Sequence, residues 1–361
     1  MCADLTQGWE FLGAGWGFWG RTVSAMRAVM CRELGPVSGL VIAEVDPPVA
    51  GPGQVVVAVE AAGVNYVDAL FVQGRYQIKP ALPFTPGSEI AGTVTAVGDG
   101  VDRVSVGDRV VASCGLGGFA EQVSVPAASV SVLPPTLDAL AAATFIQSYC
   151  TALFALTERA GVRAGEVVLV LGAGGGVGLA TIDVARALGA VTIGAASTDE
   201  KRAAATAAGA GAVIDTTSES VKDRARQLAV ELAGELVGPN ARRTGVDLVV
   251  DPVGGDLAEP ALRALGEGGR YVVIGFAAGP IPSLPLNQIL LRNRTVVGVD
   301  WGAWALHHGP EQQALLDRLL ALVADGALRP AQPRTYPLDD VAEALDDLLN
   351  RRVVGKIALR P

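Results

Sequence analysis

The sequence predicts an α/β protein with a doubly wound parallel sheet and a second, mostly β region. From residue 166 onward, short apolar runs alternate with stretches of helical periodicity, as in a sheet whose parallel strands are connected by helices. From residue 26 to about 133, the chain instead contains short Val-rich runs bounded by Gly, Pro and Asp, a pattern typical of β-strands. At 361 residues, the chain is long enough for two domains.

The first region is predicted to contain three clear strands followed by a helical stretch. The strands are QVVVAVEAAGV (54–64), EIAGTVTAVG (89–98) and DRVVASC (108–114). Ala, Leu and Phe recur at helical spacing over about 136–160, and Gly161 is a suitable end for that helix.

The second region opens with EVVLVL (166–171), an apolar strand of the kind that is buried on both faces of a parallel sheet. The elements predicted after it are helix 176–188, strand 191–196, helix 198–208, strand 211–215, helix 218–233, strand 246–251, helix 256–265, strand 270–275 and strand 295–300. Two amphipathic helices (310–324 and 338–349) and a last strand (355–359) follow. We expect these to pack on the first region, because the parallel sheet already has six strands.

Composition limits the classes of function. Half of the residues are hydrophobic and 18% are charged, which is typical of a compact globular protein. The net charge of −9 argues against non-specific binding to DNA or anionic lipid, and the apolar stretches are too short to span a bilayer. The few cysteines favour a reducing cytoplasm, although their even number leaves a disulfide possible, and with the histidines they show no metal-site spacing. These residues are Cys2, Cys31, Cys114, Cys150, His307 and His308.

The first 25 residues differ from the rest of the chain. They contain three of the five tryptophans, Trp9, Trp16 and Trp19, and they lack the basic start of a signal peptide. A more ordinary sequence begins at Met26. We therefore interpret residues 1–25 as an N-terminal extension outside the fold, such as an upstream start codon would add.

A glycine cluster, GAGGGVG (172–178), lies directly after the first strand of the second region and opens a helix. Glycines in this setting let the backbone turn sharply and approach a pyrophosphate, whose charge then lies at the positive end of the helix. The alternative is a tight turn that only brings helix and strand together. The strand–turn–helix context favours a Rossmann-type dinucleotide site. The residues expected to contact the dinucleotide are Gly175, Gly176, Val177 and Gly178.

The end of the next strand favours NADPH over NADH. An NAD site usually has Asp or Glu there, whereas this chain has Ala196 and Ser197. Ser197 and Lys201 would suit the 2′-phosphate of NADPH, and Ser197 is also predicted to cap the following helix, paired with Glu200. Lys201 could equally be a solvated helix residue.

The chain resembles the medium-chain dehydrogenase/reductase superfamily, and within it the zinc-free quinone oxidoreductases, which include zeta-crystallin. The resemblance covers about residues 26–361. The motifs that carry it are AAGVNYVDALFVQGRY (61–76), LPFTPGSEIAGTVTAVG (82–98), VGDRV (106–110), GGFAEQVSVP (117–126), GAGGGVGLA (172–180), DPVGG (251–255), GGRYVVIGFA (268–277) and GKIAL (355–359). It implies a discontinuous GroES-like catalytic domain (26–146 and 298–361) and a dinucleotide-binding domain (147–297).

The resemblance also bears on zinc. Zinc-dependent alcohol dehydrogenases of the superfamily have Cys at the position of Asn65, a His-Glu pair at Ser88 and Glu89, and a third inner ligand near Gln147. Neither Asn nor Ser is a usual zinc ligand, and one glutamate cannot hold the ion alone. We therefore expect no metal. Cys150, one turn beyond Gln147, is interpreted as a packed helix residue.

The resemblance places the acceptor near the nicotinamide, in a cleft between the domains. Asn65 and Tyr66 follow the family's G-V-N-x-V-D motif and are expected to border that cleft as catalytic residues, with Asn65 bonding an acceptor carbonyl or the ribose. Tyr76 and Trp301 are candidate walls of the substrate pocket, with an exposed loop end and the core as the respective alternatives. Asp68 is expected to tie its loop to a backbone N–H.

Further cofactor contacts are expected where the fourth and fifth strands end, because nucleotides bind there in open α/β sheets. The candidates are Val253, Gly254, Gly275 and Phe276. The stretch VVGVDWGAW (296–304) follows the strand through which family members pair, so a homodimer is expected. His307 and His308 are expected to lie on a surface loop rather than to act as a base.

Three functions remain possible on the sequence. Without a Lewis acid, alcohol oxidation is difficult, whereas hydride delivery to an electron-poor acceptor needs less help. The leading hypothesis is therefore an NADPH-dependent quinone reductase. An enoyl-thioester or enone reductase is the rival within enzymes, and a non-catalytic NADPH-binding protein is the rival outside them.

Overall fold

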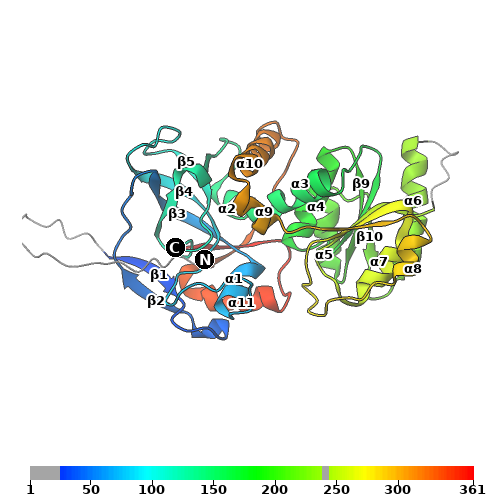
Figure 1. Ribbon diagram of the computed structural model, residues 1–361, viewed down its shortest axis with the longest axis horizontal. Helices are drawn as coiled ribbons and strands as arrows, with labels where there is room; N and C mark the ends of the chain where they lie inside the picture. Colours follow the sequence, from blue (N-terminus) through cyan, green and yellow to red (C-terminus); the bar gives the residue numbers. More distant parts are fainter. Residues whose placement is uncertain (1–24, 238–243) are drawn as a thin grey trace, which may run out of the picture.

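The computed structural model of the protein describes residues 25–237 and 244–361. Two large sheets lie side by side along the long axis of the molecule, one in a β-rich half and one in a half with helices around a parallel sheet (Figure 1). The extension predicted for residues 1–25 falls, apart from its last residue, outside the described residues. Within those residues, none of the helices combines the length and the apolar character needed to cross a membrane.

The second sheet has the strand order β10-β9-β8-β11-β12-β13, and every adjacent pair is parallel. Its strands are β8 (Val167–Leu171), β9 (Val191–Ala196), β10 (Ala212–Asp215), β11 (Val246–Asp251), β12 (Leu265–Val273) and β13 (Thr295–Gly298). The intervening helices are α4 (Gly176–Ala187), α5 (Asp199–Ala207), α6 (Val221–Val237), α7 (Ala258–Ala264) and α8 (Leu286–Leu290). The order reverses between β8 and β11, so the predicted doubly wound sheet is confirmed.

Strand β8 is buried on both faces. Val168 and Val170 pack into one hydrophobic core, and Leu169 and Leu171 pack into another on the opposite face. All four side chains are fully buried, as the apolar run predicts for a central parallel strand.

The β-rich half contains a seven-stranded sheet of order β14-β15-β3-β4-β5-β7, with β6 paired to β3. Its strands are β3 (Gln54–Val64), β4 (Glu89–Val97), β5 (Arg109–Ser113), β6 (Gln122–Pro126), β7 (Val130–Val132), β14 (Arg334–Pro337) and β15 (Ile357–Arg360). Strands β1 (Met26–Met30) and β2 (Val41–Val45) form a separate pair.

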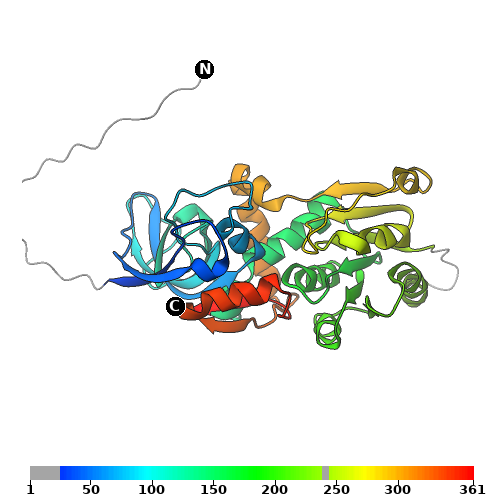
Figure 2. The same cartoon turned by 90° about the horizontal axis from the view of Figure 1, so that it is seen from below.

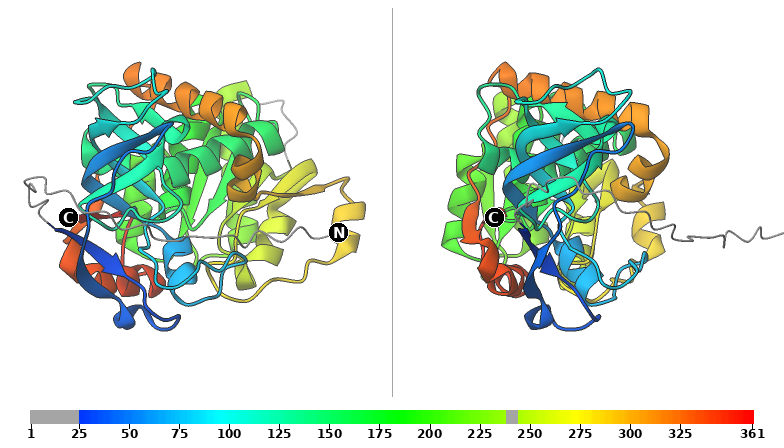
Figure 3. Two further views of the ribbon diagram at one scale, coloured as in Figure 1. Left: turned by 60° about the vertical axis from the view of Figure 1, so that its left-hand side comes forward. Right: turned by 90° about the vertical axis from the view of Figure 1, so that its left-hand side faces the viewer.

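The last part of the chain returns to this half, as predicted. Strand β15 is antiparallel to β3, and helix α11 (Val341–Leu349) packs against α1 (Tyr66–Val72). Figure 2 shows α11 in red beside the blue strands. Helix α10 (Gly309–Ala324) lies along the outside of the molecule, at the top of both views in Figure 3.

The helical stretch expected over about 136–160 is present, but it is not one regular α-helix. The structure has α2 (Ala139–Ala143), a π-helical turn η3 (Ile146–Cys150), α3 (Thr151–Phe154) and a second π-helical turn η4 (Ala155–Arg159). One physical reason is a contact from another element, because the backbone N–H of Gln147 donates to the Glu89 carboxylate. The surface loop predicted for His307 and His308 is wrong for His307, which is the last residue of helix α9 (Trp301–His307).

Candidate active site

The glycine cluster forms a tight loop between β8 and α4. Gly172 has φ +60°, a conformation that side chains rarely adopt, and a Cβ atom on Gly178 would lie 2.3 Å from the Gly172 carbonyl oxygen. Helix α4 begins after Gly175, which offers no side chain to cap it. The first N–H groups of α4 therefore have no intrahelical partner, which is the arrangement that receives a phosphate.

The stem of the Lys201 side chain lies against this loop. A Cβ atom on Gly174 would meet the Lys201 side chain at 2.4 Å, and Lys201 Nζ donates to the Arg351 carbonyl oxygen at 2.9 Å. The cap predicted here is wrong, because the N-cap of α5 is Thr198, whose hydroxyl accepts the Lys201 N–H. Ser197 is exposed at the end of β9 and is not used to cap the helix.

A segment between α11 and β15, residues 351–356, crosses from the β-rich half to the glycine loop. We call it the crossing segment. Gly355 N donates to Gly174 O at 2.7 Å, and Gly355 forms a parallel bridge with Gly175. The Arg351 guanidinium donates to the Ala277 carbonyl oxygen at 2.8 Å. One short stretch of chain therefore touches the glycine loop and the loop that follows β12.

The candidate residues after β11 and β12 lie next to each other. Asp251, at the end of β11, accepts the N–H groups of Val253 at 2.7 Å and Gly254 at 2.8 Å through one carboxylate oxygen. Gly254 has φ +66°, and a Cβ atom on it would lie 2.9 Å from the Phe276 ring. Gly275 follows the same turn, with its N–H directed to the Asp251 carbonyl oxygen. These four predicted cofactor residues therefore gather at the carboxyl edge of the sheet.

The predicted catalytic residue Asn65 belongs to a buried polar cluster. Its side-chain nitrogen donates to Glu89 Oε1 at 2.9 Å, and its side-chain oxygen accepts from Lys356 Nζ. Lys356 Nζ also lies 3.1 Å from Glu89 Oε1, and the second Glu89 oxygen accepts the Gln147 backbone N–H at 2.9 Å. Asn65, Glu89 and Gln147, all of which the resemblance places in or near the zinc site of zinc-dependent relatives, are thus linked through Glu89 and joined to a lysine. We call these four residues, Asn65, Glu89, Gln147 and Lys356, the Asn65 cluster.

Asp68 lies beside the Asn65 cluster and supports the loop. Its Oδ2 accepts the Asn65 backbone N–H at 2.7 Å, as expected from the sequence. Asp68 is fully buried, and this burial raises the pKa of its carboxyl group to about 7, although the hydrogen bond from Asn65 opposes the shift. Burial also raises the pKa of the nearby Cys114 thiol, with a smaller contribution from the Asp68 charge.

The aromatic candidates differ in their surroundings. Tyr66 is the first residue of α1 and is exposed, whereas Tyr76 is half-buried with its ring edge on Phe71. Desolvation, and then the charge of Asp300 before α9, raise the pKa of Tyr76. Trp301 is 7% exposed within the core and donates through Nε1 to a glutamine side chain of α10 at 2.6 Å, which favours the packing interpretation of this residue.

Comparison with known proteins identifies the family. A family model described as a zinc-binding dehydrogenase matches residues 176–320, and one described as an alcohol dehydrogenase GroES-like domain matches residues 51–135. Quinone oxidoreductase-like protein 2 of Bos taurus is 39% identical over 334 residues, which cover 92% of each chain. Quinone oxidoreductase of Mus musculus is 34% identical over 327 residues, covering 90% of this chain and 94% of that protein.

The chain belongs to the quinone oxidoreductase family of the medium-chain dehydrogenase/reductase superfamily. Among solved structures of this family, the quinone oxidoreductase of Escherichia coli complexed with NADPH superposes with a TM-score of 0.80 at 28% identity, covering 93% of this chain and all of that one. The chain is therefore an oxidoreductase with the Rossmann-type and GroES-like domains of this family.

Sequence reasoning missed Lys356 and Arg351 in this member of the quinone oxidoreductase family. GKIAL was read only as a family motif and as a final strand. A signal was present, since Lys356 is a charged residue directly before an apolar strand that was expected to pack on the first region. Lys and Arg are rarely buried without a partner, so a charge at that place indicates a paired side chain.

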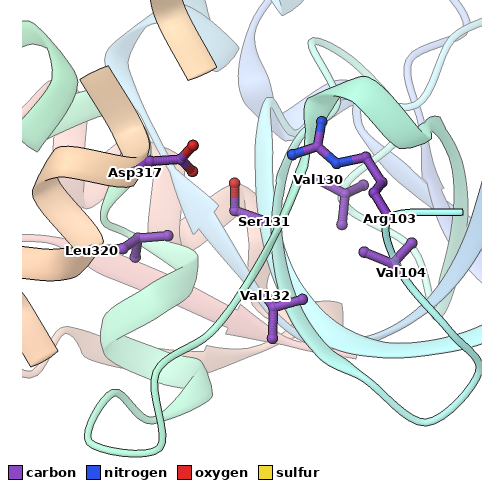
Figure 4. Close-up of a pocket in the computed structure, with 7 residues that line it drawn as sticks. All are labelled: Arg103, Val104, Val130, Ser131, Val132, Asp317 and Leu320. Carbon is purple, nitrogen blue, oxygen red and sulfur yellow. The ribbon is translucent and has the colours of Figure 1, made fainter. Parts of the chain in front are cut away.

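A hollow of about 270 Å³ lies away from these residues, between α10 and β7. Figure 4 shows Asp317 and Leu320 on one side of it and Ser131 on the other. Gln313 of α10 bonds both Ser131 and Asp317 at 2.7 Å, so this hollow is part of a packing seam. It shares no residue with the glycine loop or the Asn65 cluster.

Proposed function

We propose that the protein transfers a hydride from NADPH to a quinone without using a metal ion. The Asn65 cluster is the observation that carries this proposal. The amide of Asn65 and the hydroxyl of the neighbouring Ser88 stand where zinc-dependent relatives have cysteine and histidine, and Asn65 bonds the Glu89 carboxylate and the Lys356 ammonium group. The ammonium group of Lys356 already neutralises Glu89, so the cluster holds no surplus of negative charge to attract a divalent cation.

The glycine loop fits a dinucleotide, as its steric constraints at Gly178 and the free start of α4 indicate. Lys201 and Arg351 fit the extra phosphate of NADPH, because neither has a carboxylate partner among the described residues. The neighbouring Arg202, by contrast, is paired with Asp199 and Asp215. The Escherichia coli relative was solved with NADPH, which supports the same cofactor here. When bound, NADPH would supply the hydride from its nicotinamide ring.

We assign the remaining cofactor contacts to the residues that gather at the carboxyl edge of the sheet, namely Gly175, Gly176, Val177, Ser197, Val253, Gly254, Gly275 and Phe276. Asn65, Tyr66 and Tyr76 are proposed to lie beside the acceptor. Asn65→Ala should lower kcat more than it weakens NADPH binding, because Asn65 touches Lys356 and Glu89 rather than the glycine loop. Steady-state kinetics together with NADPH titration by fluorescence would measure both, and an equal effect on the two quantities would contradict this role.

The substrate proposal is tested by a panel of acceptors. NADPH oxidation is followed with benzoquinone, naphthoquinone, a simple enone and crotonyl-CoA, and in parallel with NADH. Turnover of the quinones supports the proposal, whereas turnover of the thioester or enone alone would favour the alternative reductase. Tight NADPH binding without turnover would indicate a non-catalytic role. Stoichiometric zinc in elemental analysis of the purified protein would contradict the metal-free mechanism.

Three further proposals concern the organisation of the protein. We retain the domain limits 26–146 with 298–361 and 147–297. We propose a homodimer through β13, an edge strand of the parallel sheet, where Val296 is exposed and the nearby helix α8 exposes Leu286 and Leu290. Sedimentation would test this pairing.

We also propose a cytoplasmic location. It is supported by the cysteines in the described part of the chain, which are free thiols.

A further inference from the structure

The Asn65 cluster contains one positive charge, on the ammonium group of Lys356. We propose that Lys356 is a catalytic residue, and that its ammonium group donates a charge-assisted hydrogen bond to the acceptor oxygen on which negative charge develops as hydride arrives. This inference rests on the proposed function, because it requires a carbonyl acceptor. It assigns to a side chain the electrostatic task that a metal ion performs in other dehydrogenases.

The backbone next to Lys356 is fixed against the cofactor loop. Gly355 is bonded to Gly174 at 2.7 Å, and a Cβ atom on Gly176 would lie 2.4 Å from the Lys356 side-chain carbon Cδ. The stem of Lys356 therefore passes over the start of α4, and its ammonium group ends at Asn65. The lysine spans from the loop that would hold the pyrophosphate to the residue that would lie beside the acceptor.

The hydrogen bonds of the ammonium group leave one donor for a ligand. A lysine ammonium has three N–H groups. Asn65 Oδ1 and Glu89 Oε1 accept two of them, and the described residues provide no third acceptor. The Lys356 side chain is 14% exposed, whereas Glu89 is completely buried. A ligand can therefore approach the pair only from the lysine side.

The negative charge of Glu89 would not completely cancel the stabilisation that the Lys356 ammonium group gives to the acceptor oxygen. Its carboxylate also accepts hydrogen bonds from the Asn65 amide and the Gln147 backbone, so its negative charge is shared among three donors. A buried ion pair is in itself weak evidence for a contribution to stability, because desolvation offsets the attraction between the charges. The Lys356–Glu89 pair lies between the glycine loop and Asn65. We therefore relate it to the reaction rather than to stability.

The hydride carries its electron pair to the acceptor, which is reduced while NADPH is oxidised. The carbonyl π electrons move to the acceptor oxygen, and that oxygen accepts the hydrogen bond from Lys356 Nζ. The hydride forms a C–H bond at a carbon conjugated with that carbonyl. In an enone, a proton from water then adds to the enolate carbon and gives the ketone. In a quinone, the proton adds to the acceptor oxygen, and the ring carbon that received the hydride loses a proton to the second carbonyl oxygen, which gives the hydroquinone.

The first test measures turnover of K356M and K356R with naphthoquinone and NADPH. K356M should lower kcat by about 100-fold, the effect of removing one donor to an oxyanion, with the KM for NADPH changed much less. K356R keeps the charge and should recover part of the loss. K222M, which removes a lysine on α6, is the matched control. A folded K356M with wild-type kcat would overturn the proposal.

The second test needs no turnover and uses 4-nitrophenol as a mimic of the reduced acceptor, with NADP⁺ present. Bound to the wild type, it should absorb as the phenolate at a pH where the free compound is mostly neutral, and this preference should vanish in K356M. E89Q should strengthen the preference, which keeps the test decisive if K356M does not fold. A purely structural lysine would not move this spectrum. A wild type without preference for the phenolate would overturn the proposal.

The two tests distinguish a failure of the role of Lys356 from a failure of the proposed function. If the wild type reduces neither quinone nor enone, the proposed function fails, and the 4-nitrophenol spectra still decide whether Lys356 stabilises an oxyanion. If the wild type reduces quinones while K356M does so equally well, the proposed function stands and the role of Lys356 fails.

Discussion

Replacing Asp68 with Asn should change how the free energy of unfolding depends on pH. Burial raises the pKa of the Asp68 carboxyl group to about 7, so the folded protein keeps this proton after the unfolded chain has lost it. Folding therefore carries no penalty from Asp68 at low pH, a growing penalty as pH rises above the unfolded pKa, and the full penalty above the folded pKa. Asn offers an oxygen to the same Asn65 N–H, so D68N removes the titration while keeping that hydrogen bond.

The size of the effect follows from the two pKa values. Between about pH 5.5 and about pH 8.5, the penalty in the wild type grows by about 2 kcal/mol, since each pKa unit corresponds to about 1.36 kcal/mol. Between these two pH values, the free energy of unfolding of D68N should therefore rise by this amount relative to that of the wild type, as measured by urea unfolding at both pH values. Groups that titrate alike in both proteins cancel in the difference. The exposed Asp102 provides the control, because D102N should show no such gain. An equal stability difference of D68N at the two pH values would refute the reasoning.

Three other substitutions test the cofactor site and its support. Lys201→Ala should raise the KM for NADPH about tenfold and leave that for NADH nearly unchanged, since only the 2′-phosphate is lost as a partner; an unchanged ratio would remove Lys201 from the site. Gly178→Ala should abolish NADPH binding in fluorescence titrations, because its Cβ would lie 2.3 Å from the Gly172 oxygen, and retained tight binding would contradict the geometry. Tyr271→Phe should lower the free energy of unfolding by about 1–3 kcal/mol, because a buried oxygen of Asp251 loses its donor. An unaltered urea midpoint would argue against that bond.

Elements with one clear periodicity could be predicted from the sequence. Strand β8 and helix α4 begin and end within one residue of their expected limits. Helix α9 was missed, because its seven residues include glycine and two tryptophans and give no clear period. The broken helix after residue 138 could not be predicted locally, since the Gln147 N–H is drawn to Glu89, a residue 58 positions away.

The candidate site was predictable only in part. The glycine loop is a local pattern, and the resemblance pointed to Asn65, Ser88 and Glu89. The partner that completes the Asn65 cluster lies 291 positions from Asn65 in the chain. Its approach depends on β15 pairing with β3, and no local signal specifies that register. Residue type alone leaves the role of Lys201 open, and the contact of its stem with Gly174 supports the proposed place beside the cofactor.

The position of β15 has a consequence for the biosynthesis of the protein. This strand comprises Ile357–Arg360 and lies between β14 and β3, so the sheet of the first domain cannot close until these residues have been synthesised. The parallel sheet ends at Gly298 and can be completed on the ribosome well before that. During this interval Ala62, Gly63 and Val64 of β3 lack their partner strand, which leaves a short unpaired edge of the kind that recruits strands from other chains. A chain that terminates before β15 would thus carry a folded dinucleotide domain joined to an aggregation-prone sheet.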